Sequence, residues 1–226
     1  MYDAVVALVK PLMLMLFKRD FRDRDRIPPR GGVIVAANHL SVADPFAIGL
    51  YLHDAGRRPR FMAKASLFRI PVLGAVLRGA GQIPVHRYSA NARIALTAAA
   101  DAVRAGELVV IYPEGTTTRD PDYWPMRART GVARLALETG APVVPVAQWG
   151  PQEFLGRRGR FRPLPRKTLR IRAGAPVDLT AYAGAKMDAR TLRDCTDAIM
   201  RDVTSLVADI RQLPAPVAGD GAKGTV

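Results

Sequence analysis

Residues 33–45 have the sequence VIVAANHLSVADP, and the rest of the chain is organised around this stretch. Its first five residues are apolar and mostly β-branched, which is typical of a buried strand. Pro45 suits the first turn of a helix, where backbone N–H groups have no helical partner. The stretch therefore predicts a strand, a tight turn and a helix, with His39 and Asp44 five residues apart on the turn.

His39 and Asp44 can work together in proton transfer. A carboxylate beside an imidazole holds one ring tautomer and stabilises the imidazolium, so the other ring nitrogen can take a proton from a hydroxyl group. Such a pair needs no serine or cysteine nucleophile, because the alcohol itself attacks. A structural interpretation also fits: Ser41 and Asp44 match the capping-box pattern, and His39 would then be an ordinary turn residue.

The composition indicates one globular domain with an anionic partner. The chain has 226 residues, enough for a sizeable core, and a formal net charge of +14. A strongly basic protein attracts lipid head groups, phosphorylated substrates or nucleic acid. The single cysteine, Cys195, excludes an intrachain disulfide and a cysteine-rich metal site. Its spacing to apolar neighbours places it on the buried face of a helix predicted over residues 188–212.

The N-terminal residues 4–17 are nearly all apolar, although Lys10 and Pro11 interrupt them, and a basic run follows at residues 18–24. The apolar run is shorter than the roughly 20 residues that a membrane-spanning helix needs. A secretory signal would have its basic region before the apolar one. We therefore expect residues 1–19 to form an amphipathic helix in the membrane interface. The alternative is a helix docked on the protein's own core.

A second strand followed by a polar turn is predicted at residues 108–119, LVVIYPEGTTTR. Gly115 lets a ligand approach the backbone closely, and threonine hydroxyls, turn N–H groups and Arg119 together can bind a phosphate group. Glu114 is acidic beside this candidate anion site, so we expect it to orient Arg or Lys side chains, or a substrate hydroxyl. The structural alternative is an ordinary turn at the end of a strand.

Strands and helices alternate along the chain. Further strands are predicted at residues 61–63, 82–85 and 143–147, and an edge strand at 167–173. Because the strands end in polar turns and helical stretches separate them, we expect an α/β fold, a βα-layered single domain whose turns converge on one edge. The expected division is an interfacial helix at 1–19, a globular domain at 20–213 and a disordered tail at 214–226.

Four blocks in order resemble the glycerolipid acyltransferases, in particular the 1-acylglycerol-3-phosphate (lysophosphatidic acid) acyltransferase family. The blocks are NHLSVAD at 38–44, residues 64–74 with Arg87 downstream, YPEGT at 112–116, and VPVA at 144–147. The resemblance implies a glycerolipid-acyltransferase-like fold. It also implies that His39 is the general base on the acceptor hydroxyl and that Asp44 orients it. The hydroxyl would attack the acyl thioester directly, without an acyl-enzyme intermediate.

The resemblance implies phosphate recognition at the second and third blocks. The residues implied are Lys64, Arg87, Glu114, Gly115 and Thr116. The family's third block usually continues Gly-Thr-Arg, whereas Thr117 stands at the arginine position in this chain. Arg119, two residues further on, would then supply the guanidinium.

The implied reaction moves a fatty acyl group to the free hydroxyl of 1-acylglycerol-3-phosphate and makes phosphatidic acid. Another lysophospholipid, or glycerol 3-phosphate, stays open as the acceptor. The donor would be acyl-CoA or acyl carrier protein as a co-substrate, and no cofactor is expected. No metal is expected either, because His53 and His86 lie outside any close ligand spacing to His39. We expect a peripheral, monotopic protein on the cytoplasmic face of the cell membrane.

The charge alone also suggests a rival of another class, a non-catalytic basic protein that binds a membrane or nucleic acid. Residues 157–172 hold eight cations, which would attract an anionic leaflet, the phosphates of coenzyme A or an acidic carrier protein. Single-strand binding would require aromatic side chains between the cations, and this block offers only Phe161. No helix-turn-helix or zinc-finger pattern is apparent, so nucleic acid is not the expected partner.

Overall fold

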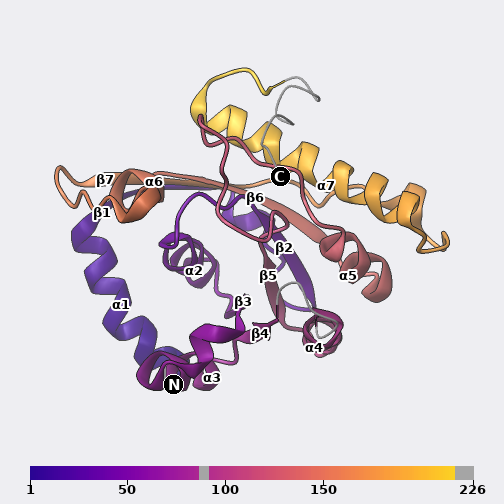
Figure 1. Ribbon diagram of the computed structural model, residues 1–226, viewed down its shortest axis with the longest axis horizontal. Coiled ribbons are helices and arrows are strands. Elements are labelled where there is room, and N and C mark those ends of the chain that lie inside the picture. Colours follow the sequence, from indigo (N-terminus) through magenta and orange to yellow (C-terminus); the bar gives the residue numbers. More distant parts are fainter. Residues whose placement is uncertain (87–91, 217–226) are drawn as a thin grey trace.

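The computed structural model describes residues 1–86 and 92–216. Its centre is a seven-stranded sheet in the order β1-β7-β6-β2-β5-β3-β4, with helices on both faces (Figure 1). The strands are β1 (Phe17–Arg22), β2 (Val33–Ala37), β3 (Pro59–Lys64), β4 (Ile83–Val85), β5 (Leu108–Ile111), β6 (Val143–Trp149) and β7 (Lys167–Ala173). The α-helices are α1 (Tyr2–Leu16), α2 (Asp44–Asp54), α3 (Pro71–Gly79), α4 (Ala92–Arg104), α5 (Gly131–Thr139), α6 (Pro151–Phe154) and α7 (Ala189–Arg211). The 3-10 helices are η1 (Arg24–Arg26), η2 (Ala65–Arg69), η3 (Arg157–Gly159) and η4 (Thr180–Tyr182).

The middle of the sheet is parallel, as the alternation of strands and helices predicts. β2 pairs in parallel with β5 and β6, and β3 pairs in parallel with β5 and β4. The carboxyl ends of these five strands therefore lie along one edge, where open α/β sheets bind ligands. The expected α/β architecture is confirmed.

The other side of the sheet differs from the expectation. β7 is not an edge strand, because it lies between β6, to which it is antiparallel, and β1, to which it is parallel. β1 begins at Phe17, so the helix predicted over residues 1–19 ends at Leu16. The four charged residues of β1, which surround its two phenylalanines, make this strand hard to recognise in the sequence. Phe17 is nevertheless only 3% exposed, and its ring centroid lies 4.7 Å from that of Phe154.

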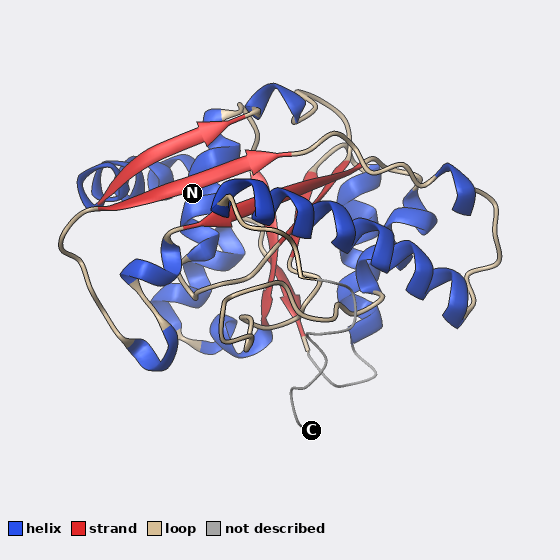
Figure 2. Cartoon of the chain, turned by 90° about the horizontal axis from the view of Figure 1, so that it is seen from above, coloured by secondary structure: helices blue, strands red, loops and turns tan. Residues whose placement is uncertain are grey.

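Alternating residues of the central strands point into two hydrophobic layers, one on each face of the sheet. Ile34 and Ala36 of β2 belong to a buried cluster with α4, α5 and α7, whereas Val33 and Val35 belong to a second cluster with α1 and α2. Such alternation follows from the period of a strand, in which successive side chains point to opposite faces. α7 crosses one face of the sheet (Figure 2), and Cys195 is fully buried on its inner side, as predicted.

Helix α1 is docked on the protein but keeps an apolar outer row. Met13 is buried against the core, and the Lys10 ammonium lies 2.9 Å from a carboxylate oxygen of Asp54 in α2. Leu8 and Leu12 remain 78% and 51% exposed. Within the part of the chain that the structure covers, no helix combines the length and the hydropathy needed to cross a bilayer.

Candidate active site

His39 and Asp44 form a close pair on the turn between β2 and α2. The His39 Nδ1 lies 2.8 Å from Oδ2 of Asp44, and the exposed fractions of the two side chains are 11% and 0%. Asp44 Oδ2 also accepts hydrogen bonds from the backbone N–H groups of Leu40 (2.5 Å) and Ser41 (3.0 Å). The carboxylate thus closes the turn, as a capping box would, and orients the imidazole at the same time.

The hydrogen bond within this pair determines which ring nitrogen of His39 is available to accept a proton. Burial raises the pKa of Asp44 above its ordinary value, while the hydrogen bonds from His39 and from two backbone N–H groups oppose that rise. A carboxylate that accepts from Nδ1 fixes the tautomer with hydrogen on Nδ1, so the lone pair is on Nε2. The ring itself stacks on Tyr112, with centroids 4.1 Å apart and planes inclined by 16°.

The second predicted turn holds the backbone of His39 from both sides. The His39 N–H donates to Oε1 of Glu114 at 2.9 Å, and the His39 carbonyl accepts from the N–H of Thr118 at 2.6 Å. The other carboxylate oxygen of Glu114 accepts from the N–H of Met126 at 2.9 Å. We expected Glu114 to orient a cationic side chain or a substrate hydroxyl. The hydrogen bonds found for its carboxylate instead join the His39 turn to the loop after β5.

Glu114 is almost completely removed from water, with 5% of its surface exposed. Burial raises the pKa of Glu114 to about 8, although the hydrogen bonds from the backbone N–H groups of Met126 and His39 favour the ionised form. The desolvation of a carboxylate outweighs two amide hydrogen bonds here. The protonation state of this buried residue is therefore sensitive to pH near neutrality.

A second clamp, which the sequence did not indicate, joins the ends of β2 and β6. The Asn38 side chain donates to the Gln148 carbonyl at 3.1 Å and accepts from the Gln148 N–H at 2.9 Å. The Gln148 amide donates to the Asn38 carbonyl at 3.0 Å. Both residues are fully buried. Their hydrogen bonds fix Asn38, which follows the last paired residue of β2 and directly precedes His39. An Asn before the motif histidine and a Gln at the end of the VPVA strand were the only available signals.

Further predicted residues come to the same edge. Lys64 is exposed at the carboxyl end of β3, in register with Val85 of β4. Gly115 and Thr116 are half-buried in the turn after β5. Arg87 lies outside the described residues.

Arg129 is a residue of this turn that sequence reasoning missed. Gly115 has φ +74°, and a Cβ atom on it would lie 3.0 Å from Nε and 3.1 Å from Cδ of Arg129. The Arg129 N–H also donates to the Pro113 carbonyl at 2.8 Å. The guanidinium thus lies against the backbone of the EGT turn. By contrast, Arg119 is exposed, and the structure places its backbone N–H 3.1 Å from Sδ of Met126.

Metal-ligating side chains do not gather at this edge. Across residues 1–86 and 92–216, no group of three or more His, Cys, Asp or Glu side chains could hold a metal ion. The chemistry that the described site can perform is proton transfer by His39 next to a turn whose glycine and arginine can receive an anion.

Solved structures and sequence relatives point to one class of protein. The crystal structure of the 1-acyl-sn-glycerophosphate (LPA) acyltransferase PlsC from Thermotoga maritima has the same fold, with a TM-score of 0.67 and 24% identity over 92% of this chain and 80% of that one. A family model described as Acyltransferase matches residues 18–149. The chain therefore belongs to the Acyltransferase family.

Two relatives show how far the similarity extends. A 1-acyl-sn-glycerol-3-phosphate acyltransferase of Borreliella burgdorferi is 32% identical over 131 residues, which is 58% of this chain and 50% of that protein. An uncharacterized protein of Mycobacterium tuberculosis is 32% identical over 162 residues, which is 66% of this chain and 43% of that protein. The chain thus spans half or less of the length of these relatives. The resemblance to the 1-acylglycerol-3-phosphate acyltransferases is confirmed.

Proposed function

We propose that this chain transfers a fatty acyl group from a thioester donor, acyl-CoA or acyl carrier protein, to the free hydroxyl of 1-acylglycerol-3-phosphate, making phosphatidic acid. The observation that carries the proposal is the 2.8 Å contact between His39 Nδ1 and the buried Asp44, on a turn held by the EGT loop. Membership of the Acyltransferase family supports it. Another lysophospholipid, or glycerol 3-phosphate, is the alternative acceptor.

The proposed mechanism uses His39 as general base and Asp44 as its positioning partner. Nε2 takes the proton of the acceptor hydroxyl while that oxygen attacks the thioester carbonyl. The tetrahedral intermediate then collapses, the C–S bond breaks, and the leaving sulfur takes the proton from the imidazolium. Asp44 stabilises the imidazolium between the two steps. The thioester is already activated, so alignment and proton transfer suffice, and we propose no further cofactor.

The acceptor's phosphate is proposed to lie at the strand ends beside His39. Lys64, Gly115 and Thr116 line this edge, and Arg87 and Arg119 stay predicted contributors. We add Arg129 to this group, because its Nε is the atom nearest to a Cβ built on Gly115. Guanidinium groups recognise phosphate through paired hydrogen bonds.

The assay that tests the function measures release of free thiol from a long-chain acyl-CoA. We expect the fastest release with 1-acylglycerol-3-phosphate, slower release with 1-acylglycerophosphocholine and with glycerol 3-phosphate, and background release in water. A rate that is the same with and without acceptor would contradict acyl transfer. Vesicle binding without any thiol release would instead favour a non-catalytic membrane protein.

Replacing Arg129 with glutamine should raise the KM for 1-acylglycerol-3-phosphate by about tenfold, since a hydrogen bond to a charged group contributes roughly 1.5–3 kcal/mol. The matched control is Arg127→Gln, which removes an exposed arginine from the same loop. Arg119→Gln compares the arginine that the sequence suggested. Equal KM values for the Arg129 and Arg127 variants would contradict a role for Arg129 in phosphate recognition.

We further propose that the protein is peripheral on the cytoplasmic face of the cell membrane, with the outer row of α1 in the interface. Leu8 and Leu12 are exposed on a helix whose other side is docked, and burying one leucine contributes about 1.5–3 kcal/mol. Leu8→Ser with Leu12→Ser should therefore weaken binding to phosphatidylglycerol-containing vesicles by about tenfold or more in a sedimentation assay. Ile94→Ser, at an isoleucine of α4 that is 66% exposed, is the control. Unchanged binding in the double variant would argue against an α1 anchor.

A further inference from the structure

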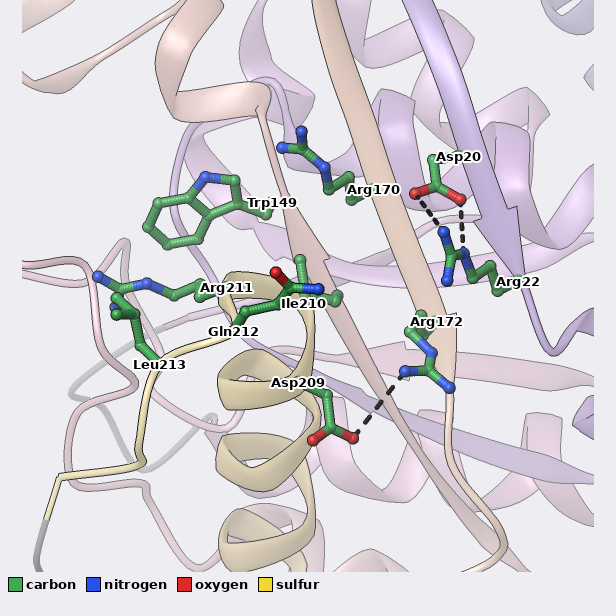
Figure 3. Close-up of a pocket in the computed structure, with 10 residues that line it drawn as sticks. All are labelled: Asp20, Arg22, Trp149, Arg170, Arg172, Asp209, Ile210, Arg211, Gln212 and Leu213. Carbon is green, nitrogen blue, oxygen red and sulfur yellow. Dashed lines mark hydrogen bonds and ion pairs between the residues drawn. The ribbon is translucent and has the colours of Figure 1, made fainter.

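A charged hollow of about 490 Å³ lies beside the end of α7 (Figure 3), and His39 is not among the residues that line it. Its walls come from β1, β7, the end of β6 and the end of α7. It is lined by Asp20, Arg22, Trp149, Arg170, Arg172, Asp209, Ile210, Arg211, Gln212 and Leu213. Its volume falls within the roughly 300–1,000 Å³ of small-molecule sites.

The hollow exists because α7 covers β6 more fully than it covers β7. Trp149 pairs in register with Arg170, which pairs in register with Asp20, so these side chains share one face of the sheet. Ala147, on the same face as Trp149, packs against Leu206 and Val207 of α7. Beyond the end of α7 this face carries charged side chains in place of an apolar layer. His39 lies on the other face, where its ring stacks on Tyr112 next to the α2 layer.

The cations of the hollow are only partly neutralised. Arg22 donates to Asp20 at 2.7 and 3.2 Å, so that carboxylate is occupied. Arg172 lies 2.9 Å from Asp23 and 4.0 Å from Asp209. The side chain of Arg170 is exposed and forms no ion pair or hydrogen bond with the described residues, and Figure 3 draws it without a dashed line. With Asp23 counted as the ion-pair partner of Arg172, four guanidinium groups face three carboxylates, which leaves an excess of one positive charge.

Arg211 lines the hollow and lies over two tryptophan rings. Its guanidinium carbon lies 4.2 Å from the ring centroid of Trp124 and 4.5 Å from that of Trp149. Burial lowers the pKa of Arg211, and its Nη1 is buried without a hydrogen-bond partner in the described structure. The N–H groups of Gln212 and Leu213 bond to the Asp209 and Ala208 carbonyls, which caps carbonyl groups that would otherwise repel an anion.

We propose that this hollow is a second anion site, which binds a phosphate monoester or pyrophosphate group of a ligand other than the acceptor at His39. A phosphate monoester carries about −1.5 to −2 charges at pH 7, so the net positive charge of the lining attracts it. Arg170 is the contributor with an unused guanidinium, and paired N–H donors suit phosphate oxygens. The site goes beyond the proposed acyl transfer, since no step of that reaction involves these residues.

The structure offers a direct optical test. The chain has two tryptophans, Trp124 and Trp149, and both contact Arg211, so all tryptophan fluorescence arises at this wall. Titrating the full chain with inorganic pyrophosphate at constant ionic strength should give a saturable fluorescence change. Arg170→Gln should weaken the pyrophosphate Kd by about tenfold, as expected for loss of one charge-assisted hydrogen bond. Arg190→Gln, which removes the same charge from a side chain that is 91% exposed on α7, should leave the Kd unchanged.

Calorimetry of the same variants repeats the measurement without relying on fluorescence. Arg129→Gln, which affects the proposed acceptor site, should leave the Kd obtained from tryptophan fluorescence unchanged, so that result is independent of the acyl transfer proposal. A non-saturable response, or equal weakening in the Arg170 and Arg190 variants, would overturn the site.

Vesicles containing phosphatidic acid distinguish the sources of the phosphate. If Arg170→Gln weakens binding to both probes, the ligand is a lipid head group. If it weakens only pyrophosphate binding, the ligand is a soluble organic phosphate.

Discussion

Replacing His39 with alanine is expected to lower acceptor-dependent thiol release by about 10²–10⁴-fold, the usual contribution of a general base. The fold should survive, because the Glu114 and Thr118 hydrogen bonds engage the backbone of residue 39 and are retained. The circular dichroism spectrum and the thermal unfolding midpoint of His39→Ala, compared with those of the unchanged protein, would establish that the fold is retained. The lost turnover then reflects the missing imidazole and not a missing structure.

His53→Ala is the matched control, since it removes a histidine whose ring centroid lies 6.2 Å from that of Tyr2, on the far part of α2. Its turnover should equal that of the unchanged protein. Asp44→Asn should also slow turnover, because a neutral amide no longer stabilises the imidazolium, while one oxygen remains to accept from Leu40 and Ser41. Full turnover in His39→Ala would remove His39 as the base.

Replacing Glu114 with alanine is expected to cost both stability and activity. Two backbone N–H groups, those of His39 and Met126, would lose their acceptor in a buried setting, at about 1–3 kcal/mol for each group. The His39 turn would lose one of its two attachments to the loop after β5, so turnover should fall as well. Urea unfolding and the thiol-release assay measure the two effects.

The pH dependence of stability gives Glu114 a separate signature. Its folded-state pKa is raised to about 8, from an unfolded value of 4.5. The folded state therefore retains a proton that the unfolded state has lost, and stability from this residue falls as pH rises between these values. The slope approaches about 1.4 kcal/mol per pH unit and flattens above the folded pKa. In Glu114→Gln, which cannot titrate, this part of the slope should vanish.

Glu138→Ala is the control for both measurements. Its carboxylate is 36% exposed and forms a surface ion pair with Arg104, so a change below about 1 kcal/mol is expected. Equal unfolding free energies for the Glu114 and Glu138 variants would show that the buried clamp contributes nothing to the turn.

The local features of this protein follow from its sequence. A β-branched run, a turn with His and Asp, and a proline at the start of a helix predict β2, the His39 turn and α2, because these depend on neighbours in the chain. The same applies to β5 and its glycine turn, and to the buried face of α7. Strand β1 escaped prediction, since its charged residues resemble a solvated segment.

Contacts between distant parts of the chain were decided only by the tertiary structure. Glu114 holds the His39 backbone across 75 residues, and Gln148 clamps Asn38 across 110 residues. The Arg129 side chain lies against Gly115, and the charged hollow lies between the end of α7 and β7. The physical reason is the order of the sheet: β2 lies between β5 and β6, which follow it far along the chain. Sequence spacing predicts which strand ends are polar, but the order of the strands determines which of those ends become neighbours.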